Sequence, residues 1–143
     1  MANVENDDEI REILKKVKTI AVVGLSPVAV RPSNGVTRYM IAHGYEIYGV
    51  RPASPPQILG RPCVESLSQL SVDVDMIDVF RNSDALPGLI DELEKWQPGK
   101  SKAGKVLWLQ EGVTDPESEA RAEKLGFRVI SDKCILKEHA RLL

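Results

Sequence analysis

The chain has 143 residues, of which 43% are hydrophobic and 28% are charged. This length suits one domain that buries its own core without metal ions or disulfides, and the composition is typical of a globular protein in water. The formal net charge of −2 provides no overall positive field, which argues against nucleic acid as a partner.

Membrane and secretory segments are not evident. No apolar stretch approaches the roughly 20 residues that cross a bilayer, and the acidic segment 1–10 lacks the basic and apolar regions of a secretory signal. We therefore expect no membrane association and a cytoplasmic location. Disulfides are rare there, so Cys63 and Cys134 are expected to be reduced, packed thiols. Their spacing matches no zinc site, and no metal is expected.

The first part of the sequence predicts a helix, a strand and a second helix. Residues 7–17 carry apolar residues at helical spacing, with acids first and lysines last. Residues 19–24, TIAVVG, form a continuous apolar run typical of a strand buried on both faces. Ser33 is the predicted N-cap of a helix that runs to about His43 and ends at Gly44.

The middle of the chain continues this alternation. Residues 45–50 predict a second strand, and the proline-rich segment 51–62 predicts a long connection that cannot be helical. A short helix is expected at 66–70, followed by a third strand at 74–80 and a helix at 83–96.

The last part of the sequence predicts two more strands with one helix between them along the chain. Residues 97–104 are expected to form a mobile surface turn before a fourth strand at 105–110. Asp115, followed by a proline, predicts the start of a helix that Gly126 closes. Residues 127–131 predict a fifth strand.

Alternating strands and helices imply a parallel sheet with helices on both faces, because parallel neighbours need crossover connections. The sequence therefore predicts one α/β domain over residues 9–143, a Rossmann-like doubly wound parallel sheet of about five strands, after a flexible N-terminus of residues 1–8. Ligands of such sheets bind beyond the carboxyl ends of the strands, where the strand order reverses.

Arginines and small polar residues follow the carboxyl ends of the predicted strands. They are Gly24, Ser26, Pro27, Arg31 and Ser33 after the first strand, Arg51 and Pro52 after the second, Phe80, Arg81 and Asn82 after the third, and Gln110, Glu111 and Gly112 after the fourth. A guanidinium suits phosphate, and so does the helix start near Ser33, Asn34 and Gly35. This edge is predicted to bind phosphate, although a complete G-x-G-x-x-G is missing.

Arg51 limits the class of nucleotide that this edge is expected to bind. In NAD-binding folds an acidic residue roughly 20 residues after the glycine motif accepts hydrogen bonds from the ribose. Arg51 occupies that place and favours a phosphorylated ribose, as in NADP or coenzyme A. The missing glycines weigh against NADP. The alternative is that Arg51 only caps a surface loop.

The ordered motifs of the chain resemble a known family. They are GLSP (24–27), RPS (31–33), VRP (50–52), ILGRPC (58–63), VDMIDVFR (74–81), LQEGV (109–113) and SDKCILKEH (131–139). Together they are similar to the small, stand-alone CoA-binding proteins, which resemble the N-terminal domain of the succinyl-CoA synthetase α subunit. Many relatives have proline at the position of Ile135.

The resemblance implies that coenzyme A lies across the strand ends. It implies that Gly24, Leu25 and Ser26 contact the diphosphate, that Arg51 and Pro52 face the 3′-phosphoadenosine, that Val79, Phe80 and Arg81 line the ligand's course, and that Gln110 and Glu111 sit near its inner end.

No catalytic constellation is evident. Cys134 and His139 would lie on nearly opposite faces of a continuous helix, and Asp75 and Asp78 lie on opposite faces of a strand. Asp78 is expected to bond loop backbone near the first strand. Cys134 is expected to be packed, with a mixed disulfide to the CoA thiol as the alternative.

The sequence thus favours a non-catalytic protein that binds coenzyme A or acyl-CoA as its small-molecule nucleotide ligand. The competing hypothesis is an NADP-dependent enzyme or an accessory subunit of an acyl-CoA ligase. Trp96 and Trp108 are expected to pack in the protein rather than to stack on bases.

Overall fold

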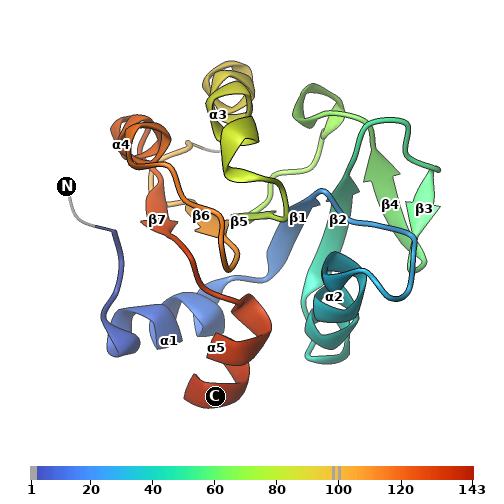
Figure 1. The fold of residues 1–143 in the computed structure, drawn as a ribbon, viewed down its shortest axis with the longest axis horizontal. Helices are drawn as coiled ribbons and strands as arrows, with labels where there is room; N and C mark the ends of the chain where they lie inside the picture. The colour runs from blue at the N-terminus through green and yellow to red at the C-terminus, as the bar shows by residue number, and fades with distance from the viewer. Residues whose placement is uncertain (1–2, 98, 100) are drawn as a thin grey trace.

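Helices and strands alternate along the chain in the computed structural model, which describes residues 3–97, 99 and 101–143 (Figure 1). The helices are α1 (Asp7–Lys16), α2 (Pro32–Ala42), α3 (Leu86–Lys95), α4 (Pro116–Lys124) and α5 (Ile135–Leu142), with short 3₁₀ helices η1 (Leu67–Gln69) and η2 (Ser83–Ala85). The strands are β1 (Thr19–Val23), β2 (Glu46–Val50), β3 (Gln57–Ile58), β4 (Arg61–Val64), β5 (Met76–Val79), β6 (Val106–Leu109) and β7 (Arg128–Ile130).

The strands of the described chain form one sheet in the order β3-β4-β2-β1-β5-β6-β7, in which the β3–β4 pair is antiparallel and the other pairs are parallel. Numbered by themselves in chain order, the parallel strands run 3-2-1-4-5-6, which is the order of the doubly wound dinucleotide-binding fold. The predicted fold class is therefore confirmed. The order reverses between β1 and β5, so the crevice for a ligand lies beyond the carboxyl ends of these two strands.

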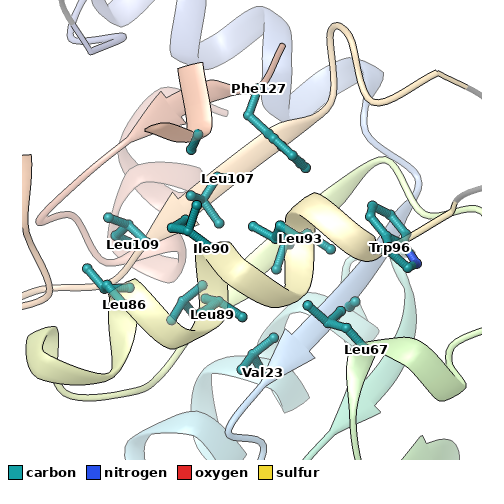
Figure 2. Close-up of a cluster of buried hydrophobic side chains, with 14 of the residues drawn as sticks. Val23, Leu67, Leu86, Leu89, Ile90, Leu93, Trp96, Leu107, Leu109 and Phe127 are labelled. Carbon is teal, nitrogen blue, oxygen red and sulfur yellow. The ribbon is translucent and has the colours of Figure 1, made fainter. Parts of the chain in front are cut away.

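Helices cover both faces of the sheet: α1, α2 and α5 lie on one side, and α3 and α4 on the other (Figure 1). The central strands therefore contribute alternate residues to two cores, and every residue of β5 and β6 is buried. Figure 2 shows the core under α3, where Leu89, Ile90 and Leu93 pack toward the sheet. Trp96 and Trp108 are both buried, as predicted.

The segment 51–62 differs from the expectation, because it contains the strand β3 and the start of β4. Gln57 pairs with Pro62, and β4 continues the sheet in parallel with β2 through Gly49 and Cys63. Over the residues that the structure describes, the sheet has seven strands instead of about five. β3 and β4 are very short, and β4 contains Pro62, which a sheet tolerates near its edge. These two strands therefore leave no alternating pattern in the sequence.

The start of α2 also differs from the prediction. Its N-cap is Arg31, followed by Pro32 in the first turn, and Ser33 lies inside the helix. Proline favours the first helical position because it has no N–H to satisfy there, a signal that places the cap one residue before it. The Ser33 hydroxyl instead accepts a hydrogen bond from Ser26 N at 3.0 Å.

Residues near the two ends of the described chain pack against the body of the domain. Val4 N donates to Val129 O at 2.8 Å, and the Asn6 side chain caps α1. Residues 135–142 form α5, for which the sequence suggested no element. The predicted turn at 97–104 includes residues 98 and 100, which lie outside the described residues. No helix in the described part of the chain has the length and apolar character needed to cross a membrane.

Candidate functional site

The carboxyl ends of β1, β2 and β5 meet at Gly24. Gly24 N donates to Val50 O at 2.8 Å, and Gly24 has a φ of 88°. A Cβ at this position would lie 2.3 Å from the carbonyl oxygen of Phe80. Only glycine combines this left-handed conformation with such a close approach of two chain segments. Gly24 therefore fixes where the loop after β1 leaves the sheet.

Side chains from the first turns of α2 hold this loop in place. Ser26 N donates to Ser33 Oγ at 3.0 Å, and Asn34 Nδ2 donates to Ser26 O at 2.9 Å. Arg38 Nε in turn donates to Asn34 Oδ1 at 2.9 Å. Ser26, Ser33 and Asn34 are buried, so these three predicted site residues support the loop with their side chains. Arg38 was not among the predicted site residues, although its spacing of four residues from Asn34 places the two on one face of a helix.

Most backbone N–H groups near this loop have partners inside the protein. Gly24 N donates to Val50 O, and Ser26 N donates to Ser33 Oγ. Asn34 N and Gly35 N both donate to Arg31 O. The positive charge available to an anion at this edge therefore comes mainly from arginine side chains.

Three arginines follow the carboxyl ends of β1, β2 and β5. Arg31 and Arg81 are exposed and Arg51 is half-buried. The Arg81 Cδ lies 3.2 Å from the position of a Cβ on Gly24, so its side chain crosses the end of β1. Within residues 3–97, 99 and 101–143, none of the three forms an ion pair. Acidic partners hold Arg11, Arg121, Arg128 and Arg141, whereas Arg38 and Arg61 also form no ion pair in this part of the chain.

A buried carboxyl group lies below this edge. Asp78 in β5 is 1% exposed, and its Oδ1 accepts a hydrogen bond from Gln110 Nε2 at 2.5 Å. Burial raises the pKa of Asp78 to about 7, and the bond from Gln110 only partly opposes this shift. The expected bond from Asp78 to the loop backbone after β1 is wrong. Gln110 Oε1 also accepts from Ile135 N at 3.3 Å, so the Gln110 side chain joins β5, β6 and α5.

The remaining predicted residues divide by exposure. The side chains of Leu25 and Val79 are fully buried in the two opposite cores, which leaves only their backbone to face a ligand. Phe80 is half-buried, and the exposed members are Pro27, Pro52, Asn82, Glu111 and Gly112. Glu111 forms an ion pair with Lys137 at 3.0 Å, which ties the loop after β6 to α5.

The histidines and cysteines form no nucleophilic pair. His139 Nδ1 shares a hydrogen bond of 2.9 Å with the Tyr39 hydroxyl, and Cys134 is the half-buried N-cap residue of α5. The exposed ring of His43, at the end of α2, bonds Tyr39 O at 2.8 Å. The described residues contain no group of three or more histidine, cysteine, aspartate or glutamate side chains arranged to hold a metal ion.

Two cavities lie at opposite edges of the sheet. The larger, of about 380 Å³, lies at the amino ends of the strands beside Lys16, Asp75 and Lys105, and contains none of the predicted site residues. The smaller, of about 270 Å³, is lined by Val23 at the carboxyl end of β1 and by Arg81 after β5. By volume alone, the larger cavity would be the better candidate for a ligand site. The reversal of strand order and the three arginines instead favour a ligand site at the edge with the smaller cavity.

The strand order places the chain in the class of doubly wound α/β domains, whose ligands bind beyond the carboxyl ends of the strands at the switch point. A family model described as "CoA binding domain" matches residues 18–140. The chain therefore belongs to this CoA-binding domain family.

Relatives are similar over nearly their whole length. The chain is 40% identical over 133 residues to the uncharacterized protein YneT of Bacillus subtilis (strain 168), covering 92% of this chain and 93% of that protein. The solved structure of cell-free ID.343 from Thermus thermophilus is 36% identical with a TM-score of 0.87, covering 97% of this chain and all of the other.

A larger protein contains a similar fold. The dinucleotide-forming acetyl-coenzyme A synthetase 1 of Ca. Korarchaeum cryptofilum, in its apo form, has a TM-score of 0.61 at 23% identity. The match covers 79% of this chain and 25% of that protein. At this identity the similarity concerns the fold.

Proposed function

We propose that the protein binds coenzyme A or an acyl-CoA at the carboxyl ends of its parallel strands, without catalysing a reaction. The observation that carries this proposal is the set of arginines at the switch point, Arg31, Arg51 and Arg81, which have no acidic partner among the described residues. Coenzyme A brings a diphosphate and a 3′-phosphate, and arginine forks match phosphate oxygens.

The three arginines divide between the two phosphate-bearing parts of the ligand. Arg51, at the end of β2, takes the 3′-phosphate of the ribose, because this is the place where an acidic residue would select an unphosphorylated ribose. Arg31 at the start of α2 and Arg81 beside Gly24 take the diphosphate, since they flank the loop after β1 from both sides. The dipole of α2 adds to this attraction.

The other proposed contacts surround this path. Two exposed valines of the loop, Val28 and Val30, offer apolar surface to the uncharged part of the ligand; Val30 is 89% exposed. Together with these two valines, the proposed set contains Gly24, Leu25, Ser26, Pro27, Arg31, Ser33, Asn34, Arg51, Pro52, Val79, Phe80, Arg81 and Gln110. Within it, Ser33, Asn34 and Gln110 act by holding the loop and the strand ends rather than as direct charge partners.

The absence of catalysis in this proposal rests on how the reactive groups are placed. Asp78 is buried and bonded to Gln110, and His139 is bonded to Tyr39 instead of to Cys134. None of them forms a nucleophile and base pair at the arginine-bearing edge.

A thermal-shift comparison of CoA, acetyl-CoA, NADP and NAD tests the proposal. A ligand at 100 times its Kd stabilises the folded state by about 2.7 kcal/mol, so CoA and acetyl-CoA are expected to raise the Tm while NAD does not. The matched control is the Arg51→Glu/Arg81→Glu double variant, in which the shift should disappear. A larger shift with NADP than with CoA would support the NADP-dependent alternative instead. An accessory subunit of an acyl-CoA ligase would show the CoA shift but form a stable complex with a ligase chain.

A further inference from the structure

The cavity of about 270 Å³ beside Arg81 opens on the side of the sheet covered by α3. Val23 and Leu89 contribute its apolar wall, and both belong to the core shown in Figure 2. Asp84, Gly88 and Glu92 line it from η2 and α3. We propose, building on the proposed CoA site, that this cavity receives the thiol end of the ligand and selects short uncharged acyl groups over acyl groups that end in a carboxylate.

The volume matches one end of a ligand. Pockets that enclose a drug-sized molecule measure about 300–1,000 Å³, so a cavity of about 270 Å³ is too small for a whole nucleotide. It accommodates a thioethyl group together with a short acyl chain. Phosphates and adenine would remain outside, on the arginine-bearing edge.

The position of the cavity fits the direction in which the ligand would run. Arg51 follows β2, and the cavity lies between β1 and α3; the sheet order is β2-β1-β5. Adjacent strands lie about 4.8 Å apart. With the 3′-phosphate at Arg51 and the diphosphate beside Gly24, the pantetheine arm extends past β1 toward β5 and reaches the cavity under Arg81.

The charge of the lining sets the acyl preference. Asp84 and Glu92 are exposed carboxylates, and neither forms an ion pair within the described part of the chain. Glu92 Oε1 accepts a long hydrogen bond of 3.4 Å from Leu67 N, which leaves its charge in place. Once Arg81 is neutralised by the diphosphate, the lining is negative. A carboxylate at the end of an acyl group would be repelled, whereas an acetyl group would meet Val23 and Leu89.

Gly88 lines the cavity and, having no side chain, leaves room in it for an acyl group. The residues 84, 88 and 92 are spaced by four, so they lie along one side of the helical segment. No heavy atom lies within 4 Å of a Cβ placed on Gly88. Because Gly88 lines the cavity and the space around its Cβ position is open, a larger side chain is expected to reduce the cavity volume. It would also favour the helix, because glycine is a poor helix former.

Isothermal titration of CoA, acetyl-CoA and succinyl-CoA tests the proposal with the full chain. The wild-type protein is expected to bind acetyl-CoA at least tenfold more tightly than succinyl-CoA. Gly88→Leu is expected to weaken acetyl-CoA at least tenfold more than it weakens CoA. The matched control, Ala120→Leu, adds the same bulk to an exposed position of α4 and should leave all affinities unchanged. Asp84→Asn/Glu92→Gln is expected to bring succinyl-CoA within threefold of acetyl-CoA.

The outcomes separate this proposal from the function on which it rests. If the wild type binds CoA but Gly88→Leu changes acetyl-CoA and CoA equally, the cavity does not receive the acyl group. Equal wild-type affinities for acetyl-CoA and succinyl-CoA would overturn the charge selection. If no CoA derivative binds, the proposed function itself fails together with this inference. The Asp84→Asn/Glu92→Gln variant keeps the cavity testable should Gly88→Leu not fold.

Discussion

Gly24 and Phe80 approach each other so closely at the switch point of the sheet that a Cβ on Gly24 would lie 2.3 Å from the Phe80 carbonyl oxygen. This contact joins the loop after β1 to the end of β5, the two segments between which the strand order reverses. The missing second and third glycines of a dinucleotide fingerprint are thus less important here than the first. One glycine provides the turn, and side chains of α2 hold the rest of the loop.

Replacing this glycine should damage both stability and the site. Gly24→Ala is expected to cost about 2–5 kcal/mol, because a left-handed conformation costs about 1–2 kcal/mol and overpacking adds about 1–3. The matched control is Gly44→Ala: Gly44 has a φ of 92° but open space around it, so only about 1–2 kcal/mol should be lost. Denaturant unfolding measures both, and equal losses would show that the contact with Phe80 carries no strain.

The role of Arg51 can be tested with a ligand that lacks one phosphate. Arg51→Glu is expected to weaken CoA at least tenfold more than dephospho-CoA, or about 1.4 kcal/mol, because only CoA carries the 3′-phosphate. Arg61→Glu makes the same change of charge at the amino end of β4, away from this edge, and should leave the ratio of the two affinities unchanged. Titration calorimetry gives the ratio. Equal losses for both ligands would remove Arg51 from the 3′-phosphate.

The buried Asp78 should make the folded state less stable as the pH rises. Its pKa of about 7 lies above the ordinary value of about 3.9, so the folded state binds more protons between these values. The free energy of unfolding contributed by Asp78 is therefore fully present below pH 4 and is lost as the pH rises to 7, by on the order of 4 kcal/mol.

Asp78→Asn keeps the acceptor for Gln110 but removes the charge. We expect the variant to exceed the wild type in stability at pH 8 and to match it at pH 4, as measured by denaturant unfolding. The matched control is Asp75→Asn. Burial alone would raise the pKa of Asp75, but N–H groups of Lys18 and Thr19 lower it overall, so this variant should lose stability at pH 8. A parallel pH profile for wild type and Asp78→Asn would show that Asp78 is ionised when folded.

His139 is expected to lower the stability of the folded state in mild acid. Burial, aided by the neighbouring His43, lowers the pKa of His139, so the unfolded state takes up a proton first as the pH falls below about 6.5. The stability that the neutral ring provides is lost over that range. His139→Asn should flatten the fall in Tm below pH 6.5, whereas Tyr39→Phe, which removes only the hydrogen bond to Nδ1, should keep it. An unchanged slope in His139→Asn would assign the acid sensitivity to other groups.

Much of the architecture could be predicted because local sequence and environment agree. The apolar run at 19–24 and the alternation that follows identify a parallel sheet, since strands buried on both faces must be apolar throughout. Short edge strands escaped prediction, because residues 57–64 pair through their backbone and carry little side-chain pattern. The N-cap of α2 was predicted at Ser33 but lies at Arg31. Ser33 therefore does not cap the helix; its hydroxyl accepts a hydrogen bond from the loop after β1.

The sequence by itself determined the alternating strands and helices, the family resemblance and the positions of three arginines at strand ends, because each depends on neighbouring residues or on their order. Only the tertiary structure decided which groups remain free: it joined Asp78 to Gln110 and Ile135, and His139 to Tyr39, across long stretches of chain. Among the residues that the structure describes, it also gave Arg31, Arg51 and Arg81 no acidic partner. Pairing across such distances depends on packing in three dimensions, which no local pattern of residues encodes.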